Sequence, residues 1–251
     1  MFALNELERI GTLRRMDTGL EEQLVLANLI LDETGLTVPF GHVSVRVPGT
    51  DRFLISRAIA PGLVTDQDLL VVDLDGKVLE GKGKWHGESW IHICIYRTRP
   101  EVHGVVHTHS LYVTALATAE GTFLPGTVFG FPFAGAKLYR KAGLVNTRER
   151  GEEMARIMGT DAAVLLKGHG ASVAGLSLEE ATVKAIMMEE AAKIQLLAGL
   201  GGGAKPYAED ELAEFARELE EQAVRNDRPA GLFERVWAYY EDRVRRGPRF
   251  S

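Results

Sequence analysis

The sequence contains a single cysteine, Cys94, among its 251 residues. One cysteine excludes a disulfide within the chain and is typical of a reducing compartment. Cys94 lies inside an apolar run with helical spacing. We therefore expect it to be a small buried hydrophobic residue rather than a reactive thiol.

The sequence also lacks a basic excess and a long apolar run. The net charge is -6 and the pI is near 5.7, which disfavours nucleic acid and anionic membranes as partners. No stretch approaches the roughly 18 apolar residues of a membrane span. Met1–Glu6 has neither the basic nor the apolar part of a secretory signal. We expect a cytoplasmic protein that binds neither nucleic acid nor membrane.

The first third predicts an antiparallel meander after one helix. Apolar spacing predicts a helix over residues 20–34, capped by Gly35. Valines alternating with polar residues predict a half-buried strand over 43–47. Further strands are predicted at 52–57, 68–73 and 77–80, the last two joined through Asp75-Gly76.

The rest of the chain alternates predicted helices and strands. Helices are expected at 88–98, 111–118, 147–158 and 177–199, with a capping box at Ser177 and Glu180, and strands at 105–110 and 162–166. A glycine- and proline-rich crossing fills 121–135. The glycines at 201–203 form the one linker-like stretch. They divide a domain over 1–203 from a helical C-terminal appendage over 204–251, which we expect to pack on the domain or on a neighbouring subunit.

His107 and His109 form the stretch around which the sequence is organised. Both lie at the end of a predicted buried strand and, being two residues apart, share one face. Two imidazoles on one face can bind one metal ion. A His-x-His pair alone is equally compatible with two satisfied core histidines.

Two further residues extend this set. His169 stands between Gly168 and Gly170 after a predicted strand, where glycines allow a sharp turn. Glu88 precedes His92 by one helical turn, and His92 either orients the glutamate or simply packs. Three histidines with one acidic residue would leave an open coordination position, as a catalytic metal requires.

The ordered motifs resemble the class II aldolase and adducin head family over roughly residues 20–200. The motifs are Gly41 to Arg46, Glu88 with His92, His107 to Ser110, and Leu165 to Gly170. The resemblance implies an α/β fold, a three-layer α/β/α sandwich with a mixed, mostly antiparallel central sheet. It implies that His107, His109 and His169 bind one divalent metal per subunit (Zn, Mn, Co or Fe), and that Glu88 is the acid/base residue. It also implies a homotetramer with active sites at subunit interfaces.

The sequence departs from the sugar-phosphate aldolases of that family. His86-Gly87 replaces a serine pair before the glutamate, His42 replaces an asparagine, and the family's tyrosine falls near Phe129. These changes remove hydrogen-bond donors for a phosphate. The resulting pattern resembles that of the family's decarboxylase branch, which acts on hydroxylated aromatic acids. On this interpretation His86 assists Glu88, while His42, Ser56 and Arg57 bind substrate, Arg57 as a carboxylate clamp. The alternatives are turn positions for His42 and His86 and a surface position for Arg57.

The sequence therefore predicts a metal-dependent carbon–carbon lyase for a small molecule, most simply a decarboxylase of a hydroxylated aromatic or related carboxylic acid. Two alternatives remain open. One is a class II aldolase or retro-aldolase acting on a sugar phosphate or hydroxy-keto compound. The other is a non-catalytic adducin-type interaction module, in which the metal ligands would have decayed. An iron-dependent oxygenase could use the same ligands.

Overall fold

The structure, a computed structural model, describes residues 18–37, 39–225 and 231–247. Met1–Glu6, on which the expectation about a secretory signal depends, lies outside these residues, as do parts of the predicted C-terminal appendage. No helix among the described residues is long and apolar enough to cross a bilayer.

Eight strands form a single sheet in the order β4-β3-β2-β1-β5-β8-β7-β6. The strands are β1 (His42–Arg46), β2 (Arg52–Ser56), β3 (Leu69–Asp73), β4 (Val78–Glu80), β5 (Gly104–Thr108), β6 (Lys137–Tyr139), β7 (Ala163–Leu166) and β8 (Gly170–Gly175). Only β6 and β7 pair in parallel; every other neighbouring pair is antiparallel. The predicted mixed, mostly antiparallel α/β sheet is confirmed.

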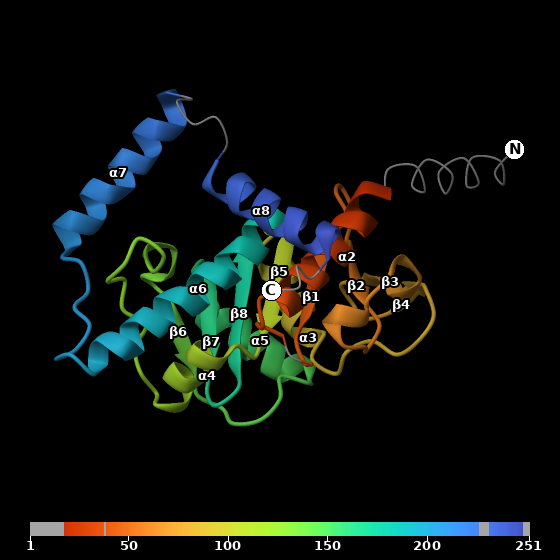
Figure 1. The fold of residues 1–251 in the computed structure, drawn as a ribbon. Coiled ribbons are helices and arrows are strands. Elements are labelled where there is room, and N and C mark those ends of the chain that lie inside the picture. The colour runs from red at the N-terminus through yellow and green to blue at the C-terminus, as the bar shows by residue number, and fades with distance from the viewer. Residues whose placement is uncertain (1–17, 38, 226–230, 248–251) are drawn as a thin grey trace, which may run out of the picture.

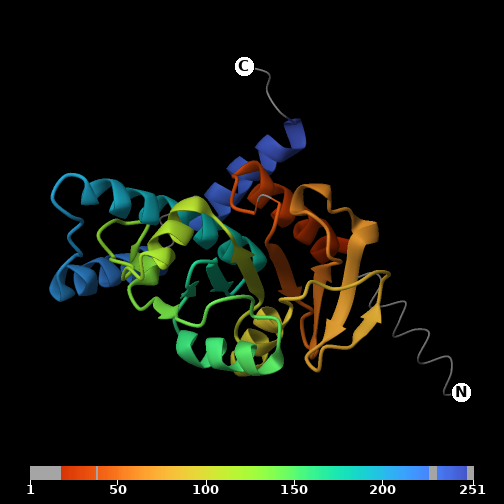
Figure 2. The ribbon, with the colours of Figure 1, turned by 90° about the horizontal axis from the view of Figure 1, so that it is seen from below.

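Helices cover both faces of this sheet, which gives three layers (Figure 2). One face carries α2 (Thr18–Glu33), α4 (Leu111–Thr118), α6 (Leu178–Gly199) and α8 (Leu232–Arg246), and the other carries α3 (Trp90–Thr98) and α5 (Arg148–Met158). Each helical layer forms its own buried apolar core with the strands. Because neighbouring residues of a strand face opposite sides, Val106 joins the first core and Val105 the second. His107 therefore lies on the α3 side.

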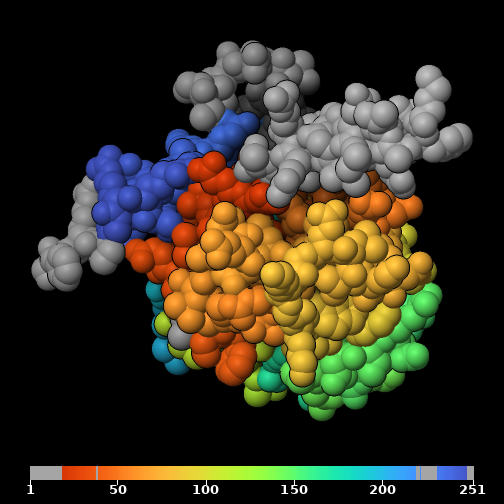
Figure 3. All heavy atoms as spheres, turned by 90° about the vertical axis from the view of Figure 1, so that its right-hand side faces the viewer, coloured from red at the N-terminus to blue at the C-terminus, as the bar shows by residue number. Residues whose placement is uncertain are grey.

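The described part of the C-terminal segment contains two helices. Figure 1 shows α7 (Glu209–Arg225) projecting from the body, while α8 returns and lies across α2 and α6. Trp237 of α8 is buried in the first core, and Arg243 and Arg245 pair with Glu33 and Glu22 of α2 at 2.8 and 2.6 Å. A domain boundary at residue 203 stays a prediction. Figure 3 views the β4 end of the sheet, where α8 (blue) lies beside α2 (red).

The prediction of a half-buried β1 is wrong, because every residue of this strand is buried. Val43 and Val45 face the first core as expected. The alternating polar residues face α3 rather than water: Ser44 hydrogen-bonds His92 and Tyr96, and the Arg46 guanidinium donates to the carbonyls of Tyr96 and Val102. Polar strand residues can be buried when each finds a partner.

Two strands were absent from the predicted elements. β6 is a three-residue edge strand, which is too short to show a pattern. β8 reads Gly-Ala-Ser-Val-Ala-Gly, and small residues score poorly as strand formers. The start of α6 explains this composition, because a Cβ on Gly175 would lie 2.5 Å from the Ala181 backbone nitrogen. Close approach of the helix requires glycine there.

Candidate metal centre and cavity

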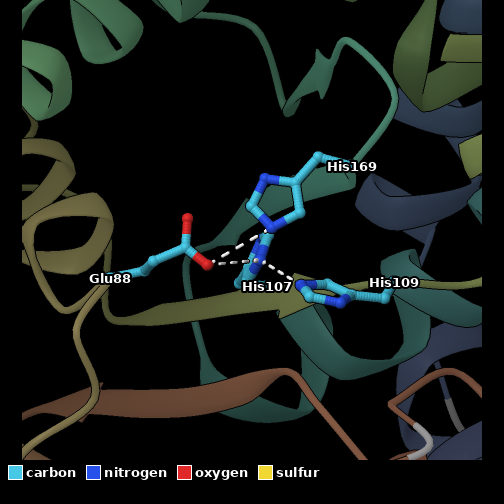
Figure 4. Close-up of side chains that lie close together, drawn as sticks. All are labelled: Glu88, His107, His109 and His169. Carbon is cyan, nitrogen blue, oxygen red and sulfur yellow. Dashed lines mark hydrogen bonds and ion pairs between the residues drawn. The ribbon is translucent and has the colours of Figure 1, made fainter. Parts of the chain in front are cut away.

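His107 and His109 come from β5 and its end, and their imidazoles converge (Figure 4). The two Nε2 atoms are 2.9 Å apart. His107 is fully buried, and its Nδ1 lies 3.0 Å from the carbonyl oxygen of Ala171 in β8. A carbonyl only accepts, so Nδ1 of His107 carries the proton and donates. Nε2 of a neutral His107 is then an unprotonated lone pair, the state that a metal ligand needs.

His169 reaches the same point from the turn between β7 and β8. Gly168 and Gly170 flank it with φ values of 64° and 132°, which side chains rarely adopt. Both ring nitrogens of His169 are buried and lack a hydrogen-bond partner among the described residues. A buried imidazole without partners is costly unless a ligand satisfies it.

The two glycines beside His169 give a matched pair of variants. Gly170→Ala would place a Cβ 2.0 Å from the Thr108 carbonyl oxygen, whereas a Cβ on Gly168 meets nothing within 4 Å. We expect Gly168→Ala to lower the free energy of unfolding by about 1 kcal/mol, through backbone strain alone, and Gly170→Ala by about 3 kcal/mol or more. Urea denaturation measures both. Equal losses in the two variants would contradict this packing.

Glu88 completes the cluster from the turn that precedes α3. Its Oε1 accepts a hydrogen bond of 2.7 Å from the Val145 backbone N–H, which fixes the carboxylate. Oε2 lies 3.3 Å from Nε2 of His169 and 3.9 Å from Nε2 of His107. Glu88 was expected inside the helix, but α3 begins at Trp90. Glu88 instead lies in the turn over residues 87–89, and this turn directs its carboxylate toward the histidines.

Together these four side chains could hold a divalent metal ion. One ligand atom from each of Glu88, His107, His109 and His169 lies within 4.8 Å of the others. The donor set of three imidazoles and a carboxylate suits zinc, manganese, cobalt or ferrous iron. The fit of a metal ion rests on two observations: the contact of Nδ1 of His107 with the Ala171 carbonyl, from which we infer an unprotonated Nε2, and the lack of hydrogen-bond partners for the ring nitrogens of His169 among the described residues.

His42 lies directly opposite His107 in the β1–β5 pair, with ring centroids 4.9 Å apart. Its Nδ1 is 2.6 Å from Nε2 of His92, whose Nδ1 is 2.6 Å from Oγ of Ser44. Both nitrogens of His92 are therefore engaged, and neither is free for Glu88. Of the two alternatives for His92, the structure favours packing, through hydrogen bonds to β1.

His86, Ser56 and Arg57 lie at the end of β2. Nε2 of His86 is 3.1 Å from Oγ of Ser56, and the His86 ring lies 4.6 Å from that of His42. Burial lowers the pKa of His86 to about 4, although a hydrogen bond with the Arg57 backbone and the charge of Glu88 act in the opposite direction. His86 is therefore neutral near pH 7.

The structure does not bring Arg57 to the metal cluster. Its Nε donates a 2.7 Å hydrogen bond to Oδ1 of Asp68, a carboxylate that Thr65 also binds. Arg57 is absent from the cavity lining described below. A carboxylate clamp at Arg57, as the sequence predicted, would need this ion pair to be exchanged for substrate. The position thus agrees with the alternative of a surface arginine.

The histidines give the metal-free protein a defined pH dependence. Burial lowers the pKa of His86 and of His109 to about 4, with the neighbouring His169 adding to the effect at His109. The unfolded chain, with histidine pKa values near 6.5, binds more protons between these values. The free energy of unfolding therefore has its full value above pH about 6.5, and it decreases as the pH falls toward about 4.

For His86 alone we expect the free energy of unfolding to decrease by on the order of 3 kcal/mol between pH about 6.5 and about 4. Urea denaturation of metal-free protein from pH about 7 to about 4.5 measures it. The His86→Gln variant isolates the ring from carboxylates that titrate in the same range, and its profile should be flatter. Parallel profiles for the parent and this variant would contradict the assignment.

A cavity of about 660 Å³ opens onto the cluster. Its polar side chains are His42, His86, Glu88, His109 and His169, and its apolar side chains are Pro39, Phe40, Ala58, Ile59, Ala60 and Leu144. Two glycines complete the lining, which contains no lysine, arginine, serine or threonine among the described residues. The walls are therefore mainly apolar around a histidine-rich floor.

Comparison with known proteins identifies the family of the chain. Residues 22–196 match the model of the family described as the class II aldolase and adducin N-terminal domain. The chain belongs to this family. The resemblance inferred from the ordered motifs is thereby confirmed, and so is the fold that it implied.

Members of this family with different reactions are similar to the chain. A 3,4-dihydroxyphthalate decarboxylase of Arthrobacter keyseri is 32% identical over 217 residues, covering 78% of this chain and 86% of the relative. An L-fuculose phosphate aldolase of Methanocaldococcus jannaschii is 34% identical over 162 residues, covering 62% and 84%. The solved L-fuculose 1-phosphate aldolase of Glaciozyma antarctica superposes with a TM-score of 0.77 at 27% identity, covering 93% and 91%.

Several other sequence positions have plain structural roles. Cys94 is buried as expected, and burial raises the pKa of its thiol to about 11. Lys167 pairs with Glu120 at the surface, and Phe129 is 41% exposed and outside the cavity lining.

The sequence analysis did not identify Phe40, Ile59 and Leu144 as cavity residues. Loop residues that line a cavity carry no periodic signal.

Proposed function

We propose that the protein is a divalent-metal-dependent carbon–carbon lyase that decarboxylates a hydroxylated aromatic or related carboxylic acid. The observation that carries this proposal is the cavity lining. Among the described residues it consists of six apolar side chains around four histidines and one glutamate, with no lysine, arginine, serine or threonine side chain. A flat apolar ring suits such walls. A phosphate needs several converging donors, which this lining does not offer.

In this proposal His107, His109 and His169 hold the ion, with Glu88 beside it. A bound divalent cation supplies positive charge that stabilises negative charge developing on substrate oxygens. The carboxyl carbon separates from the ring carbon, the electron pair stays on the ring carbon, and carbon dioxide leaves. Glu88 then delivers to that carbon a proton that it has taken up from solvent, so each turnover consumes one proton and releases one carbon dioxide. His86 is neutral near pH 7. A neutral imidazole has one N–H and one lone pair, so His86 can pass the proton from Glu88 to the substrate or orient the groups around Glu88.

The second candidate is an aldolase that acts on a sugar phosphate or hydroxy-keto compound. The sequence and fold similarity to L-fuculose phosphate aldolases supports it. A non-catalytic adducin-type module receives less support, because the three histidines and Glu88 are present and converge. Burial of these polar groups without a ligand would lower the free energy of unfolding, and no bound ion would compensate for that loss.

A substrate panel separates these candidates. Turnover of 3,4-dihydroxyphthalate and related hydroxylated aromatic acids is compared with cleavage of fuculose phosphate and ribulose phosphate, with one metal at a time. We expect carbon dioxide release from an aromatic acid and no cleavage of either sugar phosphate. Arg57→Ala is run beside the parent and should retain most activity. Cleavage of a sugar phosphate without activity on any acid would contradict the decarboxylase proposal and favour the aldolase.

We also propose that the protein forms a homo-oligomer, with a tetramer as the expected state. Large apolar side chains are exposed in the single chain, including Leu111 at 70%, Leu63 at 66% and Phe40 at 65%. Phe40 also lines the cavity, so a neighbouring copy could complete the cavity wall. Sedimentation equilibrium measures the state, and a monomer at micromolar concentration would contradict it.

A further inference from the structure

A buried chain of hydrogen bonds runs from the cavity into the layer between the sheet and α3. It begins at His42, whose Nδ1 lies 2.6 Å from Nε2 of His92. It continues from Nδ1 of His92 to Oγ of Ser44 at 2.6 Å, and from Ser44 to Oη of Tyr96 at 2.8 Å. His92 and Ser44 are fully buried and Tyr96 is 1% exposed. The chain is therefore isolated from water except at its His42 end.

Such a chain has two possible directions, because each neutral imidazole carries one proton. In the first direction, Tyr96 donates to Ser44, Ser44 donates to His92, and Nε2–H of His92 donates to Nδ1 of His42. The proton of His42 then lies on its own Nε2. In the second direction every donor is reversed, and the Tyr96 hydroxyl must donate elsewhere.

The distances favour the first direction. In the second, the acceptor that the described residues offer Tyr96 is the His103 carbonyl oxygen, 3.5 Å away, which already accepts from the Arg46 backbone N–H at 2.8 Å. Hydroxyl donors normally lie 2.5–3.0 Å from an oxygen acceptor, so a bond of this length contributes little. In the first direction every bond lies between 2.6 and 2.8 Å.

We propose that this chain holds His42 as the Nε2–H tautomer, which donates a hydrogen bond into the cavity. Ser44, His92 and Tyr96 are then positioning residues, and His42 is the residue that touches the substrate. His42 lines the cavity, and its Nε2 has no hydrogen-bond partner among the described residues. A fixed donor selects an acceptor such as a carboxylate or phenolate oxygen, and supplies the contact that Arg57 does not.

The tautomer of His42 is independent of the proposed function, whereas the substrate contact rests on it. Nitrogen NMR of protein labelled with ¹⁵N-histidine, with and without zinc, measures the tautomer directly, and His42→Asn assigns the signal. We expect a directly bonded proton on Nε2 of His42 and none on Nδ1. A proton on Nδ1 of His42 in the parent protein would overturn the proposal.

Two variants then test the positioning residues. Ser44→Ala and His92→Leu should each leave His42 as a mixture of tautomers and raise KM for 3,4-dihydroxyphthalate about tenfold, with kcat less affected. Thr182→Val is the control, because Thr182 is equally buried but faces the other core and bonds the Leu178 carbonyl. An unchanged His42 signal in both variants would overturn the positioning role. If no aromatic acid is turned over, the spectra alone decide.

Discussion

The His169→Ala protein is expected to lose its bound divalent ion while keeping its fold. The His169 side chain is 10% exposed, and both its ring nitrogens lack hydrogen-bond partners among the described residues. Alanine therefore removes the proposed metal ligand without breaking a side-chain hydrogen bond, although Oε2 of Glu88 loses a neighbour at 3.3 Å. Removing groups that merely support a ligand costs 10- to 100-fold in metal affinity, so we expect a loss of about 100-fold or more.

Elemental analysis after dialysis against a weak chelator measures this loss, and circular dichroism checks the fold. Lys167→Ala is the matched control, because Lys167 lies two residues away, at the surface, in a salt bridge with Glu120. That variant should bind metal as the parent does, since exposed ion pairs contribute little. Full metal occupancy in the His169→Ala protein would remove His169 from the ligand set.

The Glu88→Gln protein is expected to bind metal but lose most turnover. The amide oxygen can still accept the hydrogen bond that Val145 N–H donates to Oε1, so the side chain keeps its place. It can no longer exchange a proton at Oε2, the atom that lies beside His169 and His107. Proton transfer by a positioned side chain is typically worth about 10²–10⁴ in rate, and we expect a kcat loss in that range.

Steady-state kinetics on the best aromatic acid, together with metal analysis, measure this effect. Glu101→Gln serves as the control, since Glu101 pairs with Arg99 at the surface at 2.8 Å. A fall in kcat with KM and metal content close to the parent values would assign the lost step to Glu88. Unchanged turnover would exclude Glu88 from the chemistry.

The sequence predicted the parts of this centre that follow from strand geometry. His107 and His109 share a face because side chains of a strand alternate, and their Nε2 atoms indeed converge. The glycines around His169 signalled a sharp turn, which the positive φ values of both confirm. The sequence spacing could not show that His169 lies beside His107 and His109, because this depends on the pairing of β5 with β8.

Other features required the three-dimensional structure. The alternation of β1 predicted that Ser44 faces water, yet α3 covers that face and Ser44 bonds His92. Periodicity reports which residues share a face but not what covers it. Likewise, Arg57 in sequence stands beside Ser56 near the expected pocket, but Asp68 binds its guanidinium. A local sequence pattern does not identify such a partner.

The central claim is that carbon–carbon cleavage takes place at the cluster of Glu88 and the three histidines. The most direct measurement is a titration of metal-stripped protein with zinc, manganese or cobalt while carbon dioxide release from carboxyl-labelled 3,4-dihydroxyphthalate and related acids is followed. The account predicts turnover that rises with metal content, saturates at one ion per chain, and is absent from the His109→Ala protein. Full turnover by protein free of metal, or by that variant, would contradict it.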